Sequence, residues 1–395
     1  MAKLAVNGGE PVRRKPFPQW PIYGEEEEKL LLEVLRSGKW SVGGEKVKQF
    51  QQEFARFHDA AYGVACSSGW AALVIALKAL GIKRGDKVLV PAYTFAATAT
   101  AVIDVGATPV FTDINPDTLG ISVEDAERRI GEDTKCIIPV HVGGCPADMD
   151  EVVSLADRYG LKILEDAAQA HGAEWRGRKA GSIGDAGTFS FYQSKNMTSG
   201  EGGIVVTSRE EVADLAWSYH NVGRDRRREW YELVRYGWNF RMTEFQAAVL
   251  IAQLRRLPSL IDKRERSAEY LSRRLSEIEG VEPVKRPSGV TRHAYHLYIF
   301  RVDREIIKKV PKQRLVDALK AEGIPCNPGY KPLYEYRFLM REVGMSGGGL
   351  RLQNTEEVCS SVVWLPQNVL LGCEGDLDDV AEAVEKVLKN LNELA

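Results

Sequence analysis

Cysteine is scarce in this chain of 395 residues, and long hydrophobic runs are missing. The six cysteines stand at positions 66, 136, 145, 326, 359 and 373, with no Cys-x-x-Cys pair. This pattern predicts reduced, mostly buried thiols and a cytoplasmic location. No apolar run reaches the roughly 18 residues that a membrane helix needs, and the N-terminal segment lacks the apolar core of a secretion signal. We therefore expect neither a membrane protein nor a secreted one.

An excess of positive charge is also missing. Lys and Arg number 53 against 55 Asp and Glu, which gives a formal net charge of −2. Proteins that bind nucleic acid usually carry a basic excess, so nucleic acid is not an expected partner. The length fits two or three globular domains, at about 150 residues for each domain.

Short apolar runs alternate with helical patterns between about residues 62 and 207. The expected strands are Lys87–Val90, Thr108–Thr112, Lys135–His141, Leu161–Glu165, Thr188–Tyr192 and Ile204–Thr207. The expected helices between them are 70–80, 94–104, 122–130 and 149–159. Continuous apolar strands with intervening helices predict an α/β fold with a mainly parallel sheet, of the seven-stranded type, between helices. In such sheets ligands bind at the carboxyl ends of the strands.

The two ends of the chain have a different character. The first two dozen residues are rich in Pro and Gly and predict an extended arm, followed by an amphipathic helix over 25–36. A long helical pattern covers about 243–278, with an expected interruption near Pro258. A strand at Tyr295–Val302 and helices near 311–322 and 376–392 follow. We therefore predict an arm and large domain over residues 1–255 and a smaller C-terminal α+β domain over residues 256–395.

Lys195 is the first candidate for chemistry. The expected strand ending at Tyr192 delivers this lysine into a turn rich in Ser and Gly. A lysine at the end of a core strand is costly unless it is solvated, paired or used covalently. A partly desolvated lysine has a lowered pKa and can attack a carbonyl carbon to form a Schiff base. On this segment alone, a surface lysine in a tight turn explains the pattern equally well.

Asp166 is the second candidate, because it follows the expected strand Leu161–Glu165 at its carboxyl end. A carboxylate there can keep a pyridine nitrogen protonated, so that the ring accepts electrons. Gln169 lies three residues further on, within reach of the same ligand. The alternative for Asp166 is the cap of a helix N-terminus.

Two further segments offer binding groups. The run Cys66–Leu73 places small residues before an Ala-rich helix, where exposed N–H groups can bind phosphate or simply be capped. Phe95, in Pro91–Phe95, offers a ring face for stacking or for the core. A reactive lysine, a pyridinium partner, a phosphate cradle and a stacking aromatic together match pyridoxal 5′-phosphate (PLP).

With these residues in place, the sequence resembles the DegT/StrS family of PLP-dependent sugar aminotransferases, which have the fold-type I architecture. Four motifs match in order and spacing: Pro91–Phe95, Glu165–Gly172, Phe189–Gly203 and Gly237–Thr243. The resemblance implies that Lys195 forms the Schiff base and shuttles protons. It also implies that Asp166 holds the pyridine nitrogen, Gln169 the phenolic oxygen, and Phe95 a ring face.

The resemblance further implies a phosphate site that two subunits share. Its residues would be Gly69, Trp70, Ala71 and Ser190, with Asn239 from the other subunit of a homodimer. Trp70 departs from the family pattern, which usually has Thr here, so a hydroxyl contact to the phosphate is lost.

Two segments, Ala5–Arg13 and Asn221–Arg224, resemble the branch that acts on keto-cyclitols such as scyllo-inosose, or makes aminohydroxybenzoate. This branch often uses glutamine as amino donor. The nucleotide-sugar branch commonly carries His-Tyr where this chain has Gly329 and Tyr330. We therefore expect transfer of an amino group from glutamine or glutamate to a keto-cyclitol or keto-sugar, with Arg224 and Tyr330 as candidate substrate residues.

Three alternatives remain open: a nucleotide-linked keto-sugar aminotransferase, a PLP-dependent sugar dehydratase and a non-catalytic sugar sensor. The dehydratases typically replace the lysine with histidine, whereas this chain keeps Lys195. A metal site is not expected, because strand alternation would place His293 and His296 on opposite faces. His171 is expected to be structural.

Overall fold

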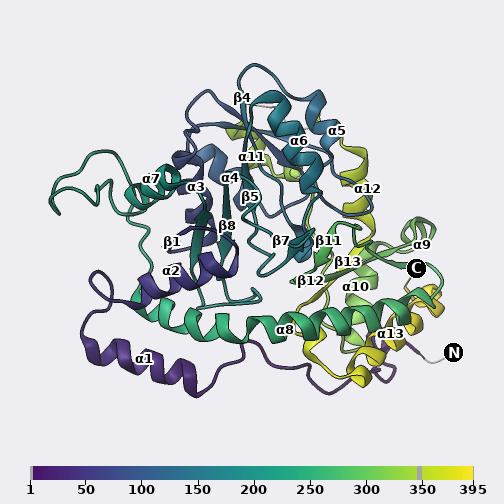
Figure 1. Ribbon diagram of the computed structural model, residues 1–395. Helices are drawn as coiled ribbons and strands as arrows, with labels where there is room; N and C mark the ends of the chain where they lie inside the picture. Colours follow the sequence, from purple (N-terminus) through teal and green to yellow (C-terminus); the bar gives the residue numbers. More distant parts are fainter. Residues whose placement is uncertain (1–2, 345–348, 395) are drawn as a thin grey trace.

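The computed structural model describes residues 3–344 and 349–394. Its centre is a seven-stranded sheet in the order β1-β9-β8-β5-β4-β2-β3 (Figure 1). The strands are β1 (Tyr62–Cys66), β2 (Lys87–Pro91), β3 (Thr108–Thr112), β4 (Thr134–Ile137), β5 (Lys162–Asp166), β8 (Ala186–Ser190) and β9 (Gly203–Thr207). Only β9 runs against its two neighbours, and the other four pairings are parallel. The predicted α/β fold with a mainly parallel sheet is confirmed.

Helices cover both faces of this sheet. They are α2 (Lys46–Phe57), α3 (Gly69–Ala79), α4 (Ala97–Asp104), α5 (Val123–Arg128), α6 (Met149–Tyr159) and α7 (Glu210–His220). The alternation along β9 shows how the faces are filled. Val205 packs in the core with α3 and α7, whereas Ile204 and Val206 pack in the core with α2. A strand covered by helices on both faces carries apolar side chains on both, which is why a short continuous apolar run located it in the sequence.

Several predicted boundaries shift for identifiable reasons. The strand expected over Lys135–His141 ends at Ile137, since Pro139 follows and the chain turns into the short helix η2 (Val142–Gly144). The strand expected over Thr188–Tyr192 ends at Ser190, where its pairing with β9 also ends. Strand β1 was not among the predicted strands.

A single long helix, α8 (Glu244–Ser276), connects the two parts of the chain. The predicted interruption near Pro258 is wrong, because the helix continues through this residue. Its buried stripe extends on both sides of the proline, with Leu254 and Ile261 fully or nearly buried. Burial of this stripe outweighs the single backbone hydrogen bond that proline cannot form. Because α8 runs unbroken across residue 255, the predicted division there stays a prediction.

The C-terminal part is a small α+β unit. Its antiparallel sheet has the order β10-β12-β13. Its strands are β10 (Val281–Pro283), β12 (Leu297–Val302) and β13 (Val362–Pro366). A separate small sheet pairs β11 (Val290–Arg292) with two strands from earlier in the chain, β6 (Glu174–Trp175) and β7 (Arg178–Lys179). The helices are α9 (Arg304–Lys309), α10 (Lys312–Ala321), α11 (Arg337–Glu342), α12 (Gln353–Ser361) and α13 (Glu374–Lys389), with short turns η3 (Leu333–Glu335), η4 (Val369–Leu371) and η5 (Leu391–Glu393).

The N-terminal arm lies against this C-terminal unit. It contains the short helix η1 (Ala5–Asn7) and leads to α1 (Glu25–Ser37). Leu4 is fully buried in the core of the C-terminal unit. The Arg13 guanidinium forms ion pairs with Asp376 at 2.9 Å and with Asp379 at 2.6 Å. The arm is therefore extended, as predicted, and fastened at α13.

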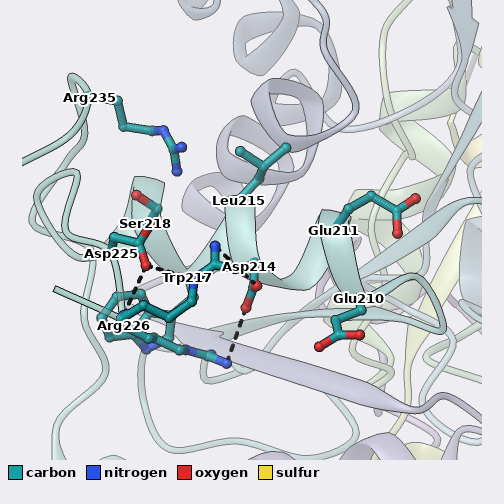
Figure 2. Close-up of a pocket in the computed structure, with 10 residues that line it drawn as sticks. Glu210, Glu211, Asp214, Leu215, Trp217, Ser218, Asp225, Arg226 and Arg235 are labelled. Carbon is teal, nitrogen blue, oxygen red and sulfur yellow. Dashed lines mark hydrogen bonds and ion pairs between the residues drawn. The ribbon is translucent and has the colours of Figure 1, made fainter.

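A long loop follows α7 and projects from the large domain at the left of Figure 1. Its base folds onto α7 around a charged cavity of about 580 Å³ (Figure 2). Arg226 lies 3.6 Å from the Asp214 carboxylate and 4.8 Å above the Trp217 ring. These contacts fix the base of the loop.

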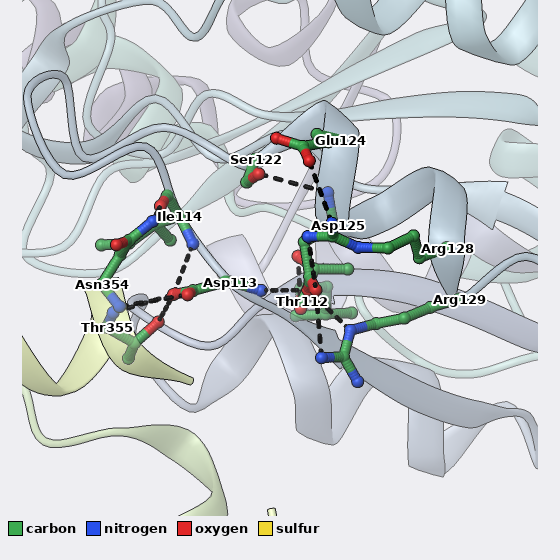
Figure 3. A network of polar contacts seen from close by, with 11 residues as sticks. Thr112, Asp113, Ile114, Ser122, Glu124, Asp125, Arg128, Arg129, Asn354 and Thr355 are labelled. Atoms are coloured by element: carbon green, nitrogen blue, oxygen red, sulfur yellow. Dashed lines mark hydrogen bonds and ion pairs between the residues drawn. The ribbon is translucent and has the colours of Figure 1, made fainter. Parts of the chain in front are cut away.

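Asp113, which directly follows β3, ties α12 to the large domain (Figure 3). Its carboxylate accepts the backbone N–H of Thr355 at 2.8 Å, the Thr355 hydroxyl at 2.7 Å and the N–H of Asn354 at 3.1 Å. Asp113 therefore caps the first turn of a helix from the far end of the chain. Its own N–H donates to Asp125 at 2.7 Å, and Arg129 pairs with Asp125.

Within the described residues, no helix is both long and apolar enough to cross a membrane. All six cysteines are free thiols, and four of them are buried.

Candidate active site

A cleft of about 740 Å³ opens at the carboxyl ends of β5 and β8. It is the place where the fold brings distant segments together. Side chains reach it from the arm, the large sheet and the C-terminal unit. Those used below are Trp20, Ser68, Gly69, Trp70, Phe95, Thr98, Asp166, Gln169, Ser190, Lys195, His296, Tyr330, Trp364 and Gln367.

Lys195 stands in the turn that follows β8. Its backbone N–H donates to the Tyr192 carbonyl at 2.9 Å. The next residue, Asn196, is buried and donates to the Ala294 carbonyl at 2.6 Å, which fixes the turn. Across the described chain, no hydrogen bond or ion pair engages the Lys195 Nζ. Burial lowers its pKa to about 8, although the Asp166 charge opposes this shift. The amine is therefore a nucleophile near neutral pH.

This pKa predicts how the amine responds to pH. Only the neutral amine attacks an aldehyde, so the rate of PLP attachment to the apoenzyme should rise with pH and level off above about pH 8. An exposed lysine would keep gaining rate up to about pH 10. Stopped-flow absorbance over pH 6–10 measures the profile. A rate that still climbs steeply beyond pH 9 would show that the fold does not depress this pKa.

Asp166 ends β5 and points into the cleft, with 6% of its surface exposed. Its Oδ2 accepts the Thr98 hydroxyl at 2.8 Å, and its Oδ1 accepts the Ala168 N–H at 3.2 Å. No helix starts behind it in the structure, because residues 167–173 form turns. The helix-cap alternative is therefore wrong. A fixed carboxylate here can hold a protonated ring nitrogen.

Gln169 links two walls of the cleft. Its Oε1 accepts the Gly143 N–H at 2.7 Å, and its Nε2 donates to the Tyr330 hydroxyl at 3.0 Å. The Tyr330 ring stands edge-on to Trp364 at 4.4 Å. Burial raises the pKa of Tyr330, so its hydroxyl remains protonated. Because this oxygen accepts from Gln169, its proton is free to donate into the cleft.

The N-terminus of α3 and the end of β8 form a close-packed cradle. Gly69 approaches Ser190 so closely that a Cβ at Gly69 would lie 2.5 Å from the Ser190 Cβ. The Ser68 hydroxyl caps α3 by accepting the Ala71 N–H at 3.1 Å. Gly69, Trp70, Ser190 and Ser68 line the cleft. Ala71 is buried, is not among the lining residues and has its N–H engaged, so its predicted phosphate contact has no support here.

The Trp70 side chain turns away from the cradle. Its indole N–H donates to the Thr100 hydroxyl at 3.1 Å, and the ring packs edge-on against Phe240. The indole N–H therefore has a partner within the chain, and Trp70 brings no hydroxyl to the cradle. The Gly69 and Trp70 backbone N–H groups at the helix start remain the donors suited to a phosphate.

Adding a methyl group at Gly69 should weaken cofactor binding. In Gly69→Ala the new Cβ overlaps Ser190, and overpacking of this kind costs about 1–3 kcal/mol. We expect the Kd for PLP to rise about tenfold or more in titrations of the apoenzyme followed by absorbance. Gly24→Ala is the matched control, because a Cβ at Gly24 meets no atom within 4 Å. An unchanged Kd in Gly69→Ala would place the phosphate elsewhere.

Phe95 is 62% exposed and lines the cleft, so packing in the core is excluded for it. Its ring centroid lies 6.4 Å from that of Tyr330. A ring face left exposed in this way is available for stacking on a planar ligand.

Arg224 and Asn239 do not line the cleft of their own chain. Asn239 is exposed and forms an isolated bridge with Asn221. The Arg224 guanidinium stacks on the Trp230 ring at 3.9 Å, and its Nε donates to the Trp230 carbonyl at 2.8 Å. Their predicted roles remain predictions about a second subunit and a substrate.

The three histidines discussed from the sequence are all buried. Strand β12 starts at Leu297, so the alternation expected for His293 and His296 is wrong. Tyr295 between them has a positive φ of 47°. His296 lines the cleft, whereas His293 stacks on Tyr295 at 3.7 Å. His171 lies between Phe189 and Phe191, with neither ring nitrogen hydrogen-bonded. Within the described part of the chain, no group of three or more His, Cys, Asp or Glu could hold a metal ion.

PLP fits these residues. The unpartnered Lys195 amine suits its aldehyde, the anchored Asp166 carboxylate suits its ring nitrogen, and the cradle at Gly69 suits its phosphate. Trp20, His296 and Gln367 also line the cleft, and the motif analysis missed them. They lie on the arm and next to β12 and β13, so only the folded chain brings them to Lys195.

The fold and this site define a fold-type I, PLP-dependent enzyme. The sequence profile of the DegT/DnrJ/EryC1/StrS aminotransferase family matches residues 21–385, and the chain belongs to this family. It is 36% identical to the L-glutamine:2-deoxy-scyllo-inosose aminotransferase of Streptoalloteichus tenebrarius, with 99% of each chain covered. It is 35% identical to the 3-amino-5-hydroxybenzoate synthase of Amycolatopsis mediterranei, over 94% of this chain and 97% of that one.

A solved structure agrees with this assignment. The crystal structure of 3-amino-5-hydroxybenzoic acid synthase superimposes with a TM-score of 0.90 and 35% identity, over 95% of this chain and 99% of that chain. The protein is therefore a PLP-dependent aminotransferase.

The residues of the cleft divide the work of amino transfer. When bound, PLP carries the amino group between substrates and accepts electrons from the substrate carbon through its protonated ring. Asp166, anchored by Thr98, would keep that ring nitrogen protonated. The Lys195 Nζ would take the proton from the α-carbon of the donor, as a general base with a pKa near neutrality can. Phe95, Tyr330 and Trp364 line the cleft around these groups with aromatic surface, against which a planar ligand can be oriented.

Proposed function

We propose that this aminotransferase moves the amino group of L-glutamine to a ketone on a carbocyclic polyol, a keto-cyclitol. The observation that carries the proposal is similarity over the full length of the chain. L-glutamine:scyllo-inosose-type aminotransferases match it at 35–37% identity over 98–100% of its residues. The intact set of Lys195, Asp166 and Gln169 in one cleft supports catalysis rather than sugar sensing.

A nucleotide-linked keto-sugar is the second candidate acceptor. Solved structures named DesV and DesI, the latter in the presence of its TDP-sugar product, superimpose with TM-scores of 0.83 and 0.87 at 34% and 28% identity. Tyr330 favours the smaller acceptor, because its ring is held inside the cleft by Gln169 and Trp364. A dehydratase structure also superimposes, at 25% identity, but retention of Lys195 favours transamination.

The proposal is tested by measuring both halves of the reaction separately. The holoenzyme is converted to its aminated form with L-glutamine or L-glutamate, and the absorbance change of the cofactor is followed. Keto-cyclitols and nucleotide-linked keto-sugars are then added one at a time to restore the original absorbance. Fast restoration by a keto-cyclitol after loading with glutamine supports the proposal. Fast restoration by a nucleotide-linked sugar alone refutes it.

We also propose that the enzyme is a homodimer whose loop after α7 reaches the partner's cleft. The base of this loop is fixed on α7 (Figure 2). Its outer part exposes large apolar side chains. Tyr231 is 89% exposed and Tyr236 is 77% exposed. Apolar groups of this size on an anchored loop are typical of a surface that a partner covers. Asn239 stands at the end of the same loop, which supports its predicted contact with the partner's phosphate site.

Mixed dimers test this shared site. Lys195→Ala and Asn239→Ala should each be poorly active alone. In a mixed dimer one of the two sites has both native residues, so unfolding and refolding the two variants together should restore about a quarter of wild-type activity. Activity no higher than the average of the two parents would contradict a shared site. Light scattering of the wild type gives the oligomeric state independently.

A further inference from the structure

Arg264, on α8, is a buried cation without an anion. Its side chain is fully buried, and no carboxylate lies within ion-pair distance in the described chain. Its Nη1 has no hydrogen-bond partner. Burial lowers its pKa to about 9, which leaves it cationic at neutral pH. An uncompensated buried charge is costly, so a compensating group is expected nearby when the enzyme is at work.

The guanidinium lies directly behind the cleft wall. Its Nε donates to the Gln367 Oε1 at 3.0 Å, and its Nη2 donates to the same oxygen. The head group also lies 5.3 Å from the Trp20 ring centroid. Gln367 and Trp20 both line the cleft. Arg264 therefore acts on the cleft through Gln367.

This contact fixes the orientation of the Gln367 amide. A guanidinium only donates hydrogen bonds, so the amide atom facing it must be the oxygen. The Nε2 group is then the end left for the cleft, and no hydrogen bond within the described residues uses it. Two N–H donors, polarised by a cation behind them, form a site that favours an anion over a neutral hydroxyl.

Gln367 shares its cleft with the reacting amine. Lys195, His296 and Gln367 all line it, so one bound molecule can meet both the amine and the amide. The phosphate cradle at Gly69 and Ser190 belongs to α3 and β8, whereas Gln367 follows β13. Of the two proposed substrates, only the amino-acid donor carries a carboxylate, and this group is attached to the carbon that bears its amine.

We propose that Gln367, oriented by Arg264, binds the α-carboxylate of the amino-acid donor. This inference rests on the proposed function for the identity of the donor. Arg264 is a positioning residue, and Gln367 makes the contact. Arg224, the arginine proposed from the sequence for substrate binding, is instead stacked on Trp230.

Gln367→Glu is the sharpest test. The new carboxylate keeps a partner for Arg264 and nearly the same volume, so the fold is preserved, while both N–H donors are replaced by a like charge. Because hydrogen bonds to charged groups contribute about 1.5–3 kcal/mol, kcat/KM for L-glutamine in the donor half-reaction should fall about 10- to 100-fold. The loss should lie in the apparent Kd and should be much larger than any change in the acceptor half-reaction, whose substrate carries no carboxylate. Arg264→Lys keeps the positive charge but loses the paired N–H donors that hold the Gln367 oxygen. It should also lower kcat/KM for L-glutamine, by a smaller factor.

Two probes separate the carboxylate from the rest of the donor. The decarboxylated analogue 4-aminobutanamide should react equally with the wild type and with Gln367→Glu. The deaminated analogue 4-carbamoylbutanoate cannot react, so calorimetry measures its binding to the holoenzyme directly, and that binding should weaken in the variant. This second readout stands even if the proposed acceptor is wrong, because it involves no amino transfer. Equal losses for both half-reactions, an effect on 4-aminobutanamide, or a donor defect found only in Arg224→Ala would overturn the proposal.

Discussion

Lys195→Ala should lower kcat by at least about 10²- to 10⁴-fold, the usual contribution of general acid–base transfer. Burial lowers the pKa of its amine to about 8, and no hydrogen bond in the described chain competes for it. Alanine removes both the covalent attachment point and the base that moves the proton at the α-carbon. Steady-state turnover with glutamine and the best acceptor measures the loss, and PLP retention can persist because the cradle at Gly69 is untouched.

Reduction with borohydride locates the attachment directly. In the wild-type holoenzyme the label should fall on the peptide that contains Lys195, and in Lys195→Ala it should disappear. Lys87→Ala is the matched control. Lys87 is the first residue of β2, at the end of the strand that lies away from the cleft, and it pairs with Asp133. Label on another peptide, or rapid multiple turnover by Lys195→Ala, would end the assignment.

Asp166→Asn should be the next most severe change, with a loss in kcat of about 10²–10³-fold, as when one preorganised electrostatic contact is removed. The amide keeps the volume and can still accept the Thr98 hydroxyl. It has no negative charge to keep the ring nitrogen protonated, so electron withdrawal from the substrate carbon weakens. Both half-reactions should slow together, because both depend on the same ring.

Thr98→Val is the companion variant, since it removes only the hydroxyl that holds the Asp166 Oδ2. A loss of one ordinary hydrogen bond, about 1 kcal/mol, should slow the reaction by about five- to tenfold. Asp166→Asn with nearly native kcat, while PLP stays bound, would show that another group protonates the ring.

The residues that could be predicted from the sequence share one property: each belongs to a short motif at the end of a buried strand. Lys195 follows β8 and Asp166 ends β5, so apolar periodicity and one polar residue sufficed to place both on one edge of the sheet. Gln367 and Trp20 carry no such local signal. They reach the cleft only because β13 and the arm pack across it, and packing over long sequence separations is not encoded in local patterns.

Local rules also failed where tertiary packing overrides them. Pro258 was expected to interrupt α8. The helix instead continues through this residue, because its buried stripe packs on both sides of the proline. The packing partners that cover this stripe are known only from the folded chain.

The Asp113 cap of α12 and the unbroken α8 have a mechanical consequence. The continuous helix α8 connects the two parts of the chain. The hydrogen bonds between Asp113 and Thr355 connect them a second time, near the end of β3. A hinge motion that separates the two parts would have to break these hydrogen bonds. We therefore expect substrates and products to exchange through small local movements of the residues that line the cleft, among them Trp20 of the arm.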